Sequence, residues 1–192
     1  MSQIQLTFSE FPKLPRWSRE IIITEKIDGT NASIFIGEDG ETFLTGSRTR
    51  WITPDEDNHG FSRWAHENKQ ELLRLGPGRH FGEWWGAGIQ RKYGLTEKRF
   101  SLFNVSRWED SAVRPACCDV VPTMYRGPMN EDHVWGMLDE LAVNGSRAAP
   151  GFMDPEGIVI WHTAANIGFK KTIKKDEVPK SVAEREVGRE FA

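Results

Sequence analysis

Several short segments of this 192-residue chain combine residue types that can do chemistry on a phosphate-bearing ligand. A neutral lysine amine is a nucleophile, arginine and lysine bind phosphate, and carboxylates hold hard cations. Aromatic rings stack on bases. In chain order the segments are Lys26-Ile27-Asp28-Gly29, Gly46-Ser47-Arg48, Phe81-Gly82-Glu83-Trp84-Trp85-Gly86, Phe100-Ser101-Leu102-Phe103, Glu156-Gly157-Ile158-Val159-Ile160 and Phe169-Lys170-Lys171.

Lys26-Ile27-Asp28-Gly29 is the first candidate for a reactive site. By itself this pattern carries little weight, because chance produces it in about one chain of ordinary composition in twenty-five. Taken alone, it also describes a hairpin turn beside a solvated lysine, since Asp-Gly is a strong short hairpin signal. The weight of the motif therefore rests on the other segments and on their order along the chain.

The elements that must position these segments read as strands interleaved with two helices. Residues 20–36 predict two strands around the Asp28-Gly29 turn, because their isoleucines and phenylalanine favour strand. Residues 61–75 and 130–143 have helical spacing, and the second segment carries acids in its first turn. We expect further strands at 41–48, 79–84, 99–107, 116–121, 155–162 and 169–173, a surface loop at 51–60, a glycine-rich loop at 84–94 and a charged helical tail at 176–192. This order predicts an α+β fold on antiparallel sheets, and the length predicts a single domain, residues 1–192.

Composition excludes several classes of protein. With 38% hydrophobic and 28% charged residues the chain is typical of a globular protein. No apolar run is long enough to span a membrane, and the first residues lack the pattern of a signal peptide. Cys117 and Cys118 are adjacent, so a disulfide between them would be strained, and we interpret them as reduced thiols of a cytoplasmic protein. The net charge of −3 argues against non-specific coating of nucleic acid but permits a local basic groove.

The order of the segments resembles that of the covalent nucleotidyltransferase superfamily, which contains ATP-dependent DNA ligases, RNA ligases and mRNA capping enzymes. Residues 25–36 (EKIDGTNASIFI) and 81–92 (FGEWWGAGIQRK) are most similar to the RNA ligase branch typified by the second RNA ligase of T-even bacteriophages. The resemblance spans roughly residues 20–177. It implies an ATP-grasp-like nucleotidyltransferase domain, in which two packed antiparallel sheets with flanking helices hold an AMP pocket between them.

The activity that the resemblance implies is ATP-dependent joining of 5′-phosphate and 3′-hydroxyl ends of RNA, in RNA repair. Lys26 would attack the α-phosphorus of ATP and form a lysyl-AMP phosphoramidate with loss of pyrophosphate. AMP would then pass to the 5′-phosphate end, and a 3′-hydroxyl would displace it. Glu156 would hold the accompanying metal ion, Mg²⁺ or Mn²⁺, through hard oxygen ligands.

The resemblance also assigns residues to parts of the nucleotide. Asn31 and Arg48 would hold the ribose and the RNA end, Glu83 would accept a hydrogen bond from a ribose hydroxyl, and Phe103 would stack on adenine. Ordinary structural roles stay open for three of them: a solvated arginine, a strand glutamate paired with an arginine, and a core phenylalanine. The residues beside the nucleophile would line the nucleotide pocket, the first two mostly through their backbone: Thr24, Glu25 and Ile27.

The last motif leaves the choice of lysine open. Lys170 follows an aromatic residue and is the first choice for a catalytic cation. Strand alternation puts Lys174 on the same face, whereas Lys171 is the alternative by adjacency. Such lysines would clamp the phosphates and stabilise the charge on departing pyrophosphate.

The expected partner is RNA with 5′-phosphate and 3′-hydroxyl ends, held as a nicked duplex. No association with a membrane is expected. Basic residues could form patches around the pocket, and several tryptophans could stack on bases, although burial is their more usual role. The arginines and lysines are Arg48, Arg50, Arg91, Lys92, Lys98 and Arg99; the tryptophans are Trp51, Trp84, Trp85 and Trp108.

One departure from the family pattern keeps two alternatives open. After Lys170 only 22 residues remain (192 − 170), fewer than the appended C-terminal domain of larger relatives would need. The chain could therefore be a small ATP-dependent DNA ligase, or a module that binds nucleotide or a nick and seals it with a partner subunit.

Overall fold

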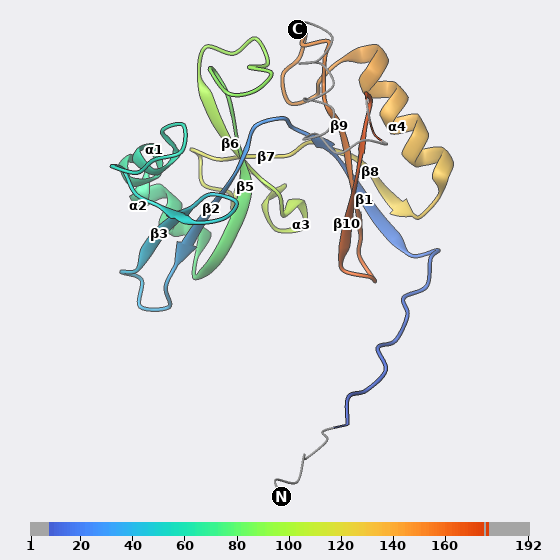
Figure 1. The fold of residues 1–192 in the computed structure, drawn as a ribbon, viewed down its shortest axis with the longest axis horizontal. Coiled ribbons are helices and arrows are strands. Elements are labelled where there is room, and N and C mark those ends of the chain that lie inside the picture. Colours follow the sequence, from blue (N-terminus) through green and yellow to red (C-terminus); the bar gives the residue numbers. More distant parts are fainter. Residues whose placement is uncertain (1–7, 175, 177–192) are drawn as a thin grey trace, which may run out of the picture.

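The computed structural model describes residues 8–174 and 176, and it places two β-sheets next to each other with helices on their outer sides (Figure 1). Sheet A has the strand order β10-β9-β1-β8, and sheet B has the order β4-β3-β2-β5-β6-β7. Every pairing is antiparallel except the parallel pair β6–β7. The predicted α+β class with antiparallel sheets is confirmed. The strands are β1 Glu20–Lys26, β2 Thr30–Ile36, β3 Phe43–Gly46, β4 Trp51–Ile52, β5 Gly78–Gly86, β6 Lys98–Leu102, β7 Asp119–Val120, β8 Thr123–Pro128, β9 Gly157–His162 and β10 Ile167–Thr172.

Helices cover the outer face of each sheet (Figure 1). α4 begins after Asn130, whose side-chain oxygen accepts a hydrogen bond from the backbone N–H of Asp132 at 2.9 Å. This cap satisfies an N–H that the first turn cannot pair, and the helix lies close to the predicted 130–143. The helices are α1 Phe61–Glu67, α2 Lys69–Leu72, the 3₁₀ helix η1 Leu73–Leu75, α3 Val105–Trp108 and α4 Glu131–Asn144.

Three hydrophobic clusters distinguish the helix-covered outer face of each sheet from the inner face that looks toward the other sheet. In sheet B, Ile34 and Phe100 pack on the side of α1 and α2. In sheet A, Ile21 and Ile23 pack against α4. Between the two sheets, Ile22 packs in one cluster with Trp85. Because neighbouring side chains of a strand point to opposite faces, the inner faces of both sheets are defined by these residues.

The predicted hairpin around Asp28-Gly29 is wrong. β1 pairs with β8 and β9 in sheet A, whereas β2 pairs with β3 and β5 in sheet B. The connection crosses between the sheets over β5, where a Cβ on Gly29 would lie 2.5 Å from the carbonyl oxygen of Trp84 and 2.7 Å from the Cβ of Trp85. Gly29 is therefore required by the close approach of two chain segments. Lys26 ends β1 of sheet A, and β2 of sheet B begins four residues later, at Thr30.

Other element boundaries differ for local reasons. The predicted helix 61–75 is interrupted at Asn68, whose side chain donates to the carbonyl of Trp64 at 2.8 Å and competes with continued helix. The predicted strand 99–107 ends at Leu102 because Asn104 caps α3. The segments 51–52 and 123–128 form strands that were not predicted, and the expected tail helix at 176–192 lies almost wholly outside the described residues. Within the described part of the chain, no helix has the length and apolar character needed to cross a membrane.

Candidate active site

Lys26 is the last residue of β1 and lies on the inner face of sheet A. It shares the alternation of Ile22, which packs between the sheets, and is opposite in phase to Ile23, which packs against α4. The side chain of Lys26 is 23% exposed. The candidate nucleophile is thus partly shielded from solvent yet open to a ligand between the sheets.

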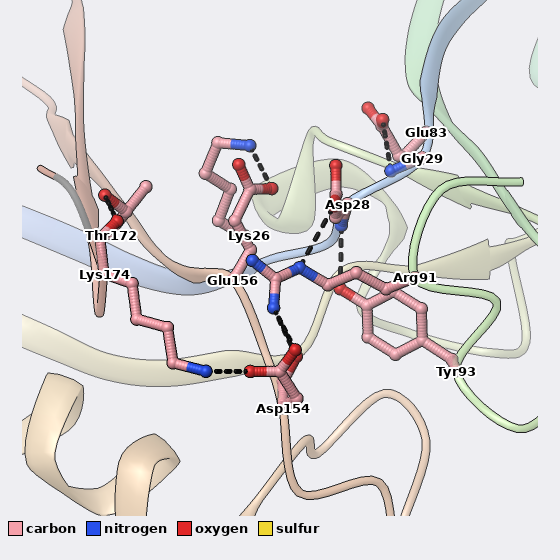
Figure 2. A network of polar contacts seen from close by, with 10 residues as sticks. All are labelled: Lys26, Asp28, Gly29, Glu83, Arg91, Tyr93, Asp154, Glu156, Thr172 and Lys174. Carbon is pink, nitrogen blue, oxygen red and sulfur yellow. Dashed lines mark hydrogen bonds and ion pairs between the residues drawn. The ribbon is translucent and has the colours of Figure 1, made fainter. Parts of the chain in front are cut away.

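Glu156 meets Lys26 directly. Its Oε2 atom forms an ion pair with the Nζ of Lys26 (Figure 2). The strand register explains the meeting, because Lys26 pairs with Gly157 across β1 and β9. Gly157 has a φ of 153°, and a Cβ there would lie 2.2 Å from the carbonyl oxygen of Lys171. The Glu-Gly pair therefore combines a carboxylate that contacts Lys26 with a glycine that lets β10 approach.

Glu83 faces the same gap from sheet B. Its Oε1 atom accepts a hydrogen bond from the N–H of Gly29, and its Oε2 atom accepts one from Nδ2 of Asn31, both at 3.1 Å. Burial raises the pKa of Glu83 to about 7, although Lys26 and the Gly29 N–H oppose that rise. Its hydrogen-bond partners are amide groups rather than an arginine, so the carboxylate holds the connection between the sheets while it lies close enough to Lys26 for the two charges to interact.

A chain of alternating charges anchors the segment that follows Lys26 (Figure 2). Tyr93 and Arg91 both hold Asp28: the N–H of Asp28 donates to the hydroxyl oxygen of Tyr93 at 2.7 Å, and its Oδ2 accepts from Nε of Arg91 at 3.0 Å. Arg91 also donates through Nη1 to the carbonyl oxygen and the Oδ2 of Asp154, at 2.8 and 2.6 Å. Asp154 accepts from Nζ of Lys174 at 2.7 Å, and this contact lowers the pKa of Asp154, as does the nearby Arg91. The network connects the segment after Lys26 to Lys174, which follows β10.

The loop that supplies Arg91 and Tyr93 has an unusual backbone. Positive φ angles are uncommon for residues other than glycine, and they persist where the surroundings hold them. Here the ring of Tyr93 is held by Trp85 at 5.0 Å and by Phe152 at 4.6 Å between ring centres. The residues of this loop with positive φ are Gly86, Gly88, Gln90, Lys92, Tyr93 and Gly94.

The roles of Tyr93 and Asp154 were not predicted from the sequence, and Arg91 was considered either as part of a basic patch or as a partner of Glu83. Tyr93 and Arg91 lie in the run GIQRKYG, whose first part carried the family resemblance, so their segment was marked although their contacts were not. No sequence pattern distinguishes Asp154. Its contact with Arg91 depends on the tertiary fold, which brings the loop after β5 to the segment before β9.

The residues predicted beside the nucleophile have different surroundings. Glu25 is 1% exposed, and its carboxylate accepts hydrogen bonds from Oγ of Ser146 at 2.6 Å and from the N–H groups of Arg147 and Ala148 at 2.8 Å. Burial raises the pKa of Glu25, while these hydrogen bonds oppose the rise. The side chain of Glu25 thus holds the loop after α4. Thr24 is buried on the inner side of β1, and Ile27 is buried between the sheets.

The lysines of the last motif lie on opposite faces of β10. Lys170 pairs with Val159 and is exposed on the inner face, the face of Lys26. Lys171 pairs with Ile158, a residue of the cluster under α4. The Nζ of Lys171 donates to Oδ2 of Asp176 at 3.0 Å and lies 4.2 Å from the ring centre of Trp135. Lys170, and not Lys171, shares the face of the nucleophile.

The remaining predicted residues lie on sheet B or in the segments next to its strands. Arg48 is exposed in the turn between β3 and β4, Asn31 is partly buried at the start of β2, and Phe103 is 41% exposed after β6. Among residues 8–174 and 176, no group of three or more His, Cys, Asp or Glu side chains is arranged to hold a metal ion. Of the four tryptophans singled out, three are buried, Trp84, Trp85 and Trp108, whereas Trp51 is 47% exposed.

Comparison with known proteins gives a family and a set of structures with a similar fold. A family model described as RNA ligase matches residues 19–175, and no curated protein matches the chain. A ligand-free variant of Naegleria gruberi RNA ligase is similar with a TM-score of 0.59 and 17% identity, over 81% of this chain and 50% of that chain. A variant with AMP and Mn gives the same values, and one with ATP and Mn gives a TM-score of 0.62 and 16% identity over 88% and 52%. The chain spans about half the length of these structures, and the likeness shows a shared fold.

Proposed function

Because the chain belongs to the RNA ligase family, we propose that it is an ATP-dependent RNA ligase that works through a lysyl-AMP intermediate on Lys26. The observation that carries the proposal is the contact between Nζ of Lys26 and the carboxylate of Glu156, with Glu83 facing them from the other sheet. The Naegleria structures with AMP or ATP and Mn support the choice of nucleotide.

In the first step, Nζ of Lys26 attacks the α-phosphorus of ATP. The nitrogen–phosphorus bond forms while the bond from phosphorus to the pyrophosphate oxygen breaks. An ammonium group has no free electron pair, so Lys26 must first lose a proton, and Glu156 is in contact with the nitrogen that releases it. Lys170, on the same face, would stabilise the charge on pyrophosphate.

In the second step, an oxygen of the RNA 5′-phosphate attacks the phosphorus of AMP and Lys26 leaves. In the third, a 3′-hydroxyl attacks that 5′-phosphate, and AMP departs. Asn31 and Arg48, on the sheet B side, would orient the ribose and the end to be joined. Glu83 would accept a hydrogen bond from a ribose hydroxyl, and Phe103 would stack on adenine, which its 41% exposure permits.

A divalent metal ion fits this site only with help from the substrate. The described residues offer no three-carboxylate cage, but Glu156 and Glu83 supply hard oxygen atoms beside Lys26. Mg²⁺ and Mn²⁺ are often held by one or two carboxylates together with phosphates and waters. Glu156 would therefore hold the ion, which would neutralise charge on the phosphates of ATP.

We propose a nicked RNA duplex with 5′-phosphate and 3′-hydroxyl ends as the substrate, and RNA repair in the cytoplasm as the role. Sealing of a nick with ribose at the 3′-hydroxyl side, compared with a deoxyribose nick, separates an RNA ligase from a DNA ligase. Equal or faster sealing of the deoxyribose nick would count against the proposed RNA substrate.

The test of the chemistry is the intact mass after incubation with ATP and Mg²⁺ or Mn²⁺. We expect the wild type to gain one AMP, and Lys26→Ala to gain none. Lys69→Ala, which removes a lysine of α2 above the ring of Phe43, serves as the matched control and should gain AMP like the wild type. Absence of AMP on the wild type, or its presence on Lys26→Ala, would refute a lysyl-AMP at Lys26.

A further inference from the structure

Sheet B exposes an aromatic surface beside the candidate active site. The register places Phe81 opposite Ser33, Ser33 opposite Gly46, and Gly46 opposite Trp51, so these residues form one row across β5, β2, β3 and β4. Trp51 is 47% exposed and Phe81 is 52% exposed. The two residues between them are small, Ser33 and Gly46. A Cβ on Gly46 would lie only 3.2 Å from the indole of Trp51. The indole therefore lies close over the sheet.

This row is the neighbour of the row that faces Lys26. Glu83 pairs with Asn31 on β2, and Phe81 is two residues earlier in β5, so both side chains project from the same face. The distance between such rows is about 7 Å, which equals roughly two stacked base steps of 3.4 Å. On the other side, the N–H of Phe103 donates to the carbonyl of Phe81 at 3.0 Å. The aromatic surface is thus continuous with the proposed adenine and ribose sites.

An arginine completes the surface. The guanidinium of Arg79 lies 4.8 Å from the ring centre of Trp51 and 5.0 Å from that of Phe81. Its Nε and Nη2 atoms donate to Oγ of Ser33 at 3.3 and 3.2 Å, which fixes the plane. In the part of the chain that the structure describes, Arg79 takes part in no ion pair. Its charge is therefore available to a phosphate.

We propose that Trp51, Arg79 and Phe81, here called the stacking platform, bind an unpaired nucleobase of the RNA substrate next to the end being joined. This inference rests on the proposed ligase function. Flat aromatic faces with a cation between them bind any base, and exposed positive charge suits the phosphate backbone. Continuity with the nucleotide site favours RNA over a protein partner, and the platform adds to the proposed nicked duplex a preference for ends whose bases are frayed or unpaired next to the junction.

The test compares Trp51→Ala, Phe81→Ala and the double variant with the wild type. The probe is a fluorescent, 5′-phosphorylated single-stranded RNA, set against a fully paired RNA hairpin of equal length. We expect the double variant to bind the single strand about 5- to 100-fold more weakly, the range typical of a lost stacking contact, and the hairpin nearly unchanged. Arg79→Lys should weaken single-strand binding too, because it keeps charge but loses the flat stacking plane.

The matched control is Trp135→Ala, a tryptophan of α4 that is 51% exposed on the outer side of sheet A. It should bind RNA like the wild type. Self-adenylylation of each variant, including its dependence on ATP concentration, reports folding and the ATP site, and it should be unchanged.

Several results would overturn the inference. The inference is refuted if the double variant binds the single strand as tightly as the wild type does. It is also refuted if the variants need a higher ATP concentration for adenylylation, because the platform would then belong to the ATP site. A dimer of the wild type that dissociates in Trp51→Ala would assign the surface to a second copy of the chain instead. Failure of the wild type itself to form lysyl-AMP would refute the proposed function, and that readout is separate from RNA binding.

Discussion

The two sides of the candidate site are built in different ways. On sheet B, Glu83 is 7% exposed, and its carboxylate oxygens accept hydrogen bonds from Gly29, in the connection between the sheets, and from Asn31, at the start of β2. On the edge of sheet A, Lys170 is exposed and the side chain of Lys174 is 69% exposed, held by an ion pair with Asp154. Buried hydrogen-bonded groups fix geometry, whereas exposed ion pairs contribute little to stability.

This difference shows which residues contribute both to the stability of the fold and to the proposed chemistry. On the sheet B side, the groups proposed to recognise ribose also hold the two sheets together. On the β10 side, the cations proposed to bind phosphates are free to adjust to ATP, pyrophosphate or RNA in turn. Substitutions near Glu83 should therefore change stability together with activity, and substitutions in β10 should change activity alone.

The largest effect on stability is expected at the joint between the two sides, with Gly29→Ala. The added Cβ would meet the carbonyl oxygen of Trp84 at 2.5 Å, and backbone cannot move away as a side chain can. We expect the free energy of unfolding to fall by about 2–4 kcal/mol, measured by urea denaturation. Gly136→Ala, in the middle of α4 with no atom within 4 Å of the new Cβ, is the control and should gain about 0.5–1 kcal/mol. Equal effects of both substitutions would contradict the proposed crowding.

The second effect depends on pH and tests the burial of Glu83. Burial raises the pKa of Glu83 from its ordinary value of 4.5 to about 7, so between these pH values the folded state holds a proton that the unfolded state has lost. The stability gained from this group is complete below pH 4.5 and is lost as the pH rises through 7. Between pH 5 and 8 the loss should be about 2–3 kcal/mol in the wild type and be absent in Glu83→Gln.

Urea unfolding of both proteins at pH 5, 6, 7 and 8 measures this difference. Glu97→Gln, on an exposed glutamate paired with Arg99, is the control and should follow the wild type at every pH. A constant difference between wild type and Glu83→Gln across the range would mean that Glu83 does not hold a proton in the folded state.

A smaller effect is expected for Tyr93→Phe, which removes one hydroxyl from the same side of the site. The N–H of Asp28 loses its acceptor in a buried setting, so the free energy of unfolding should fall by about 1–2 kcal/mol. Thermal unfolding would register about 2–6 °C. Tyr125→Phe removes a hydroxyl that donates to the carbonyl of Pro128 at 3.1 Å in an exposed place, and it should cost less than about 0.5 kcal/mol. A larger loss of stability in Tyr125→Phe than in Tyr93→Phe would mean that the hydroxyl of Tyr93 does not anchor the segment at Asp28.

The sequence predicted this site better than the path of the chain through it. Lys26 and Glu156 were identified by motif order, and the structure brings them together although 130 positions separate them. The hairpin failed because Asp-Gly is a local signal, whereas the actual path is set by contacts of Asp28 with Arg91 and Tyr93. Local pattern gives no warning of such contacts.

The strands show the same limit. The strands beside Lys26 and Glu156 have isoleucine-rich runs and were predicted near their observed positions. β8, Thr123–Pro128, escaped prediction because Pro122, Gly127 and Pro128 read as turn signals. It exists because it pairs with β1 along the edge of sheet A, where a proline disturbs few hydrogen bonds.

The smallest effect on stability, and the sharpest test of the comparison, comes from Lys170→Ala set beside Lys171→Ala. Both lysines lie on β10, so each substitution should change the free energy of unfolding by less than about 1 kcal/mol. Their faces differ: Lys170 shares the face of Lys26, whereas Lys171 points to Trp135 and Asp176. Loss of one group that stabilises charge developing in a transition state typically costs about 10²–10³ in rate, so single-turnover adenylylation should slow by about that factor in Lys170→Ala and by less than about threefold in Lys171→Ala. The reverse order would mean that β10 presents its other face to ATP, and the division of the site into a fixed and an adjustable side would then lose its chemical basis.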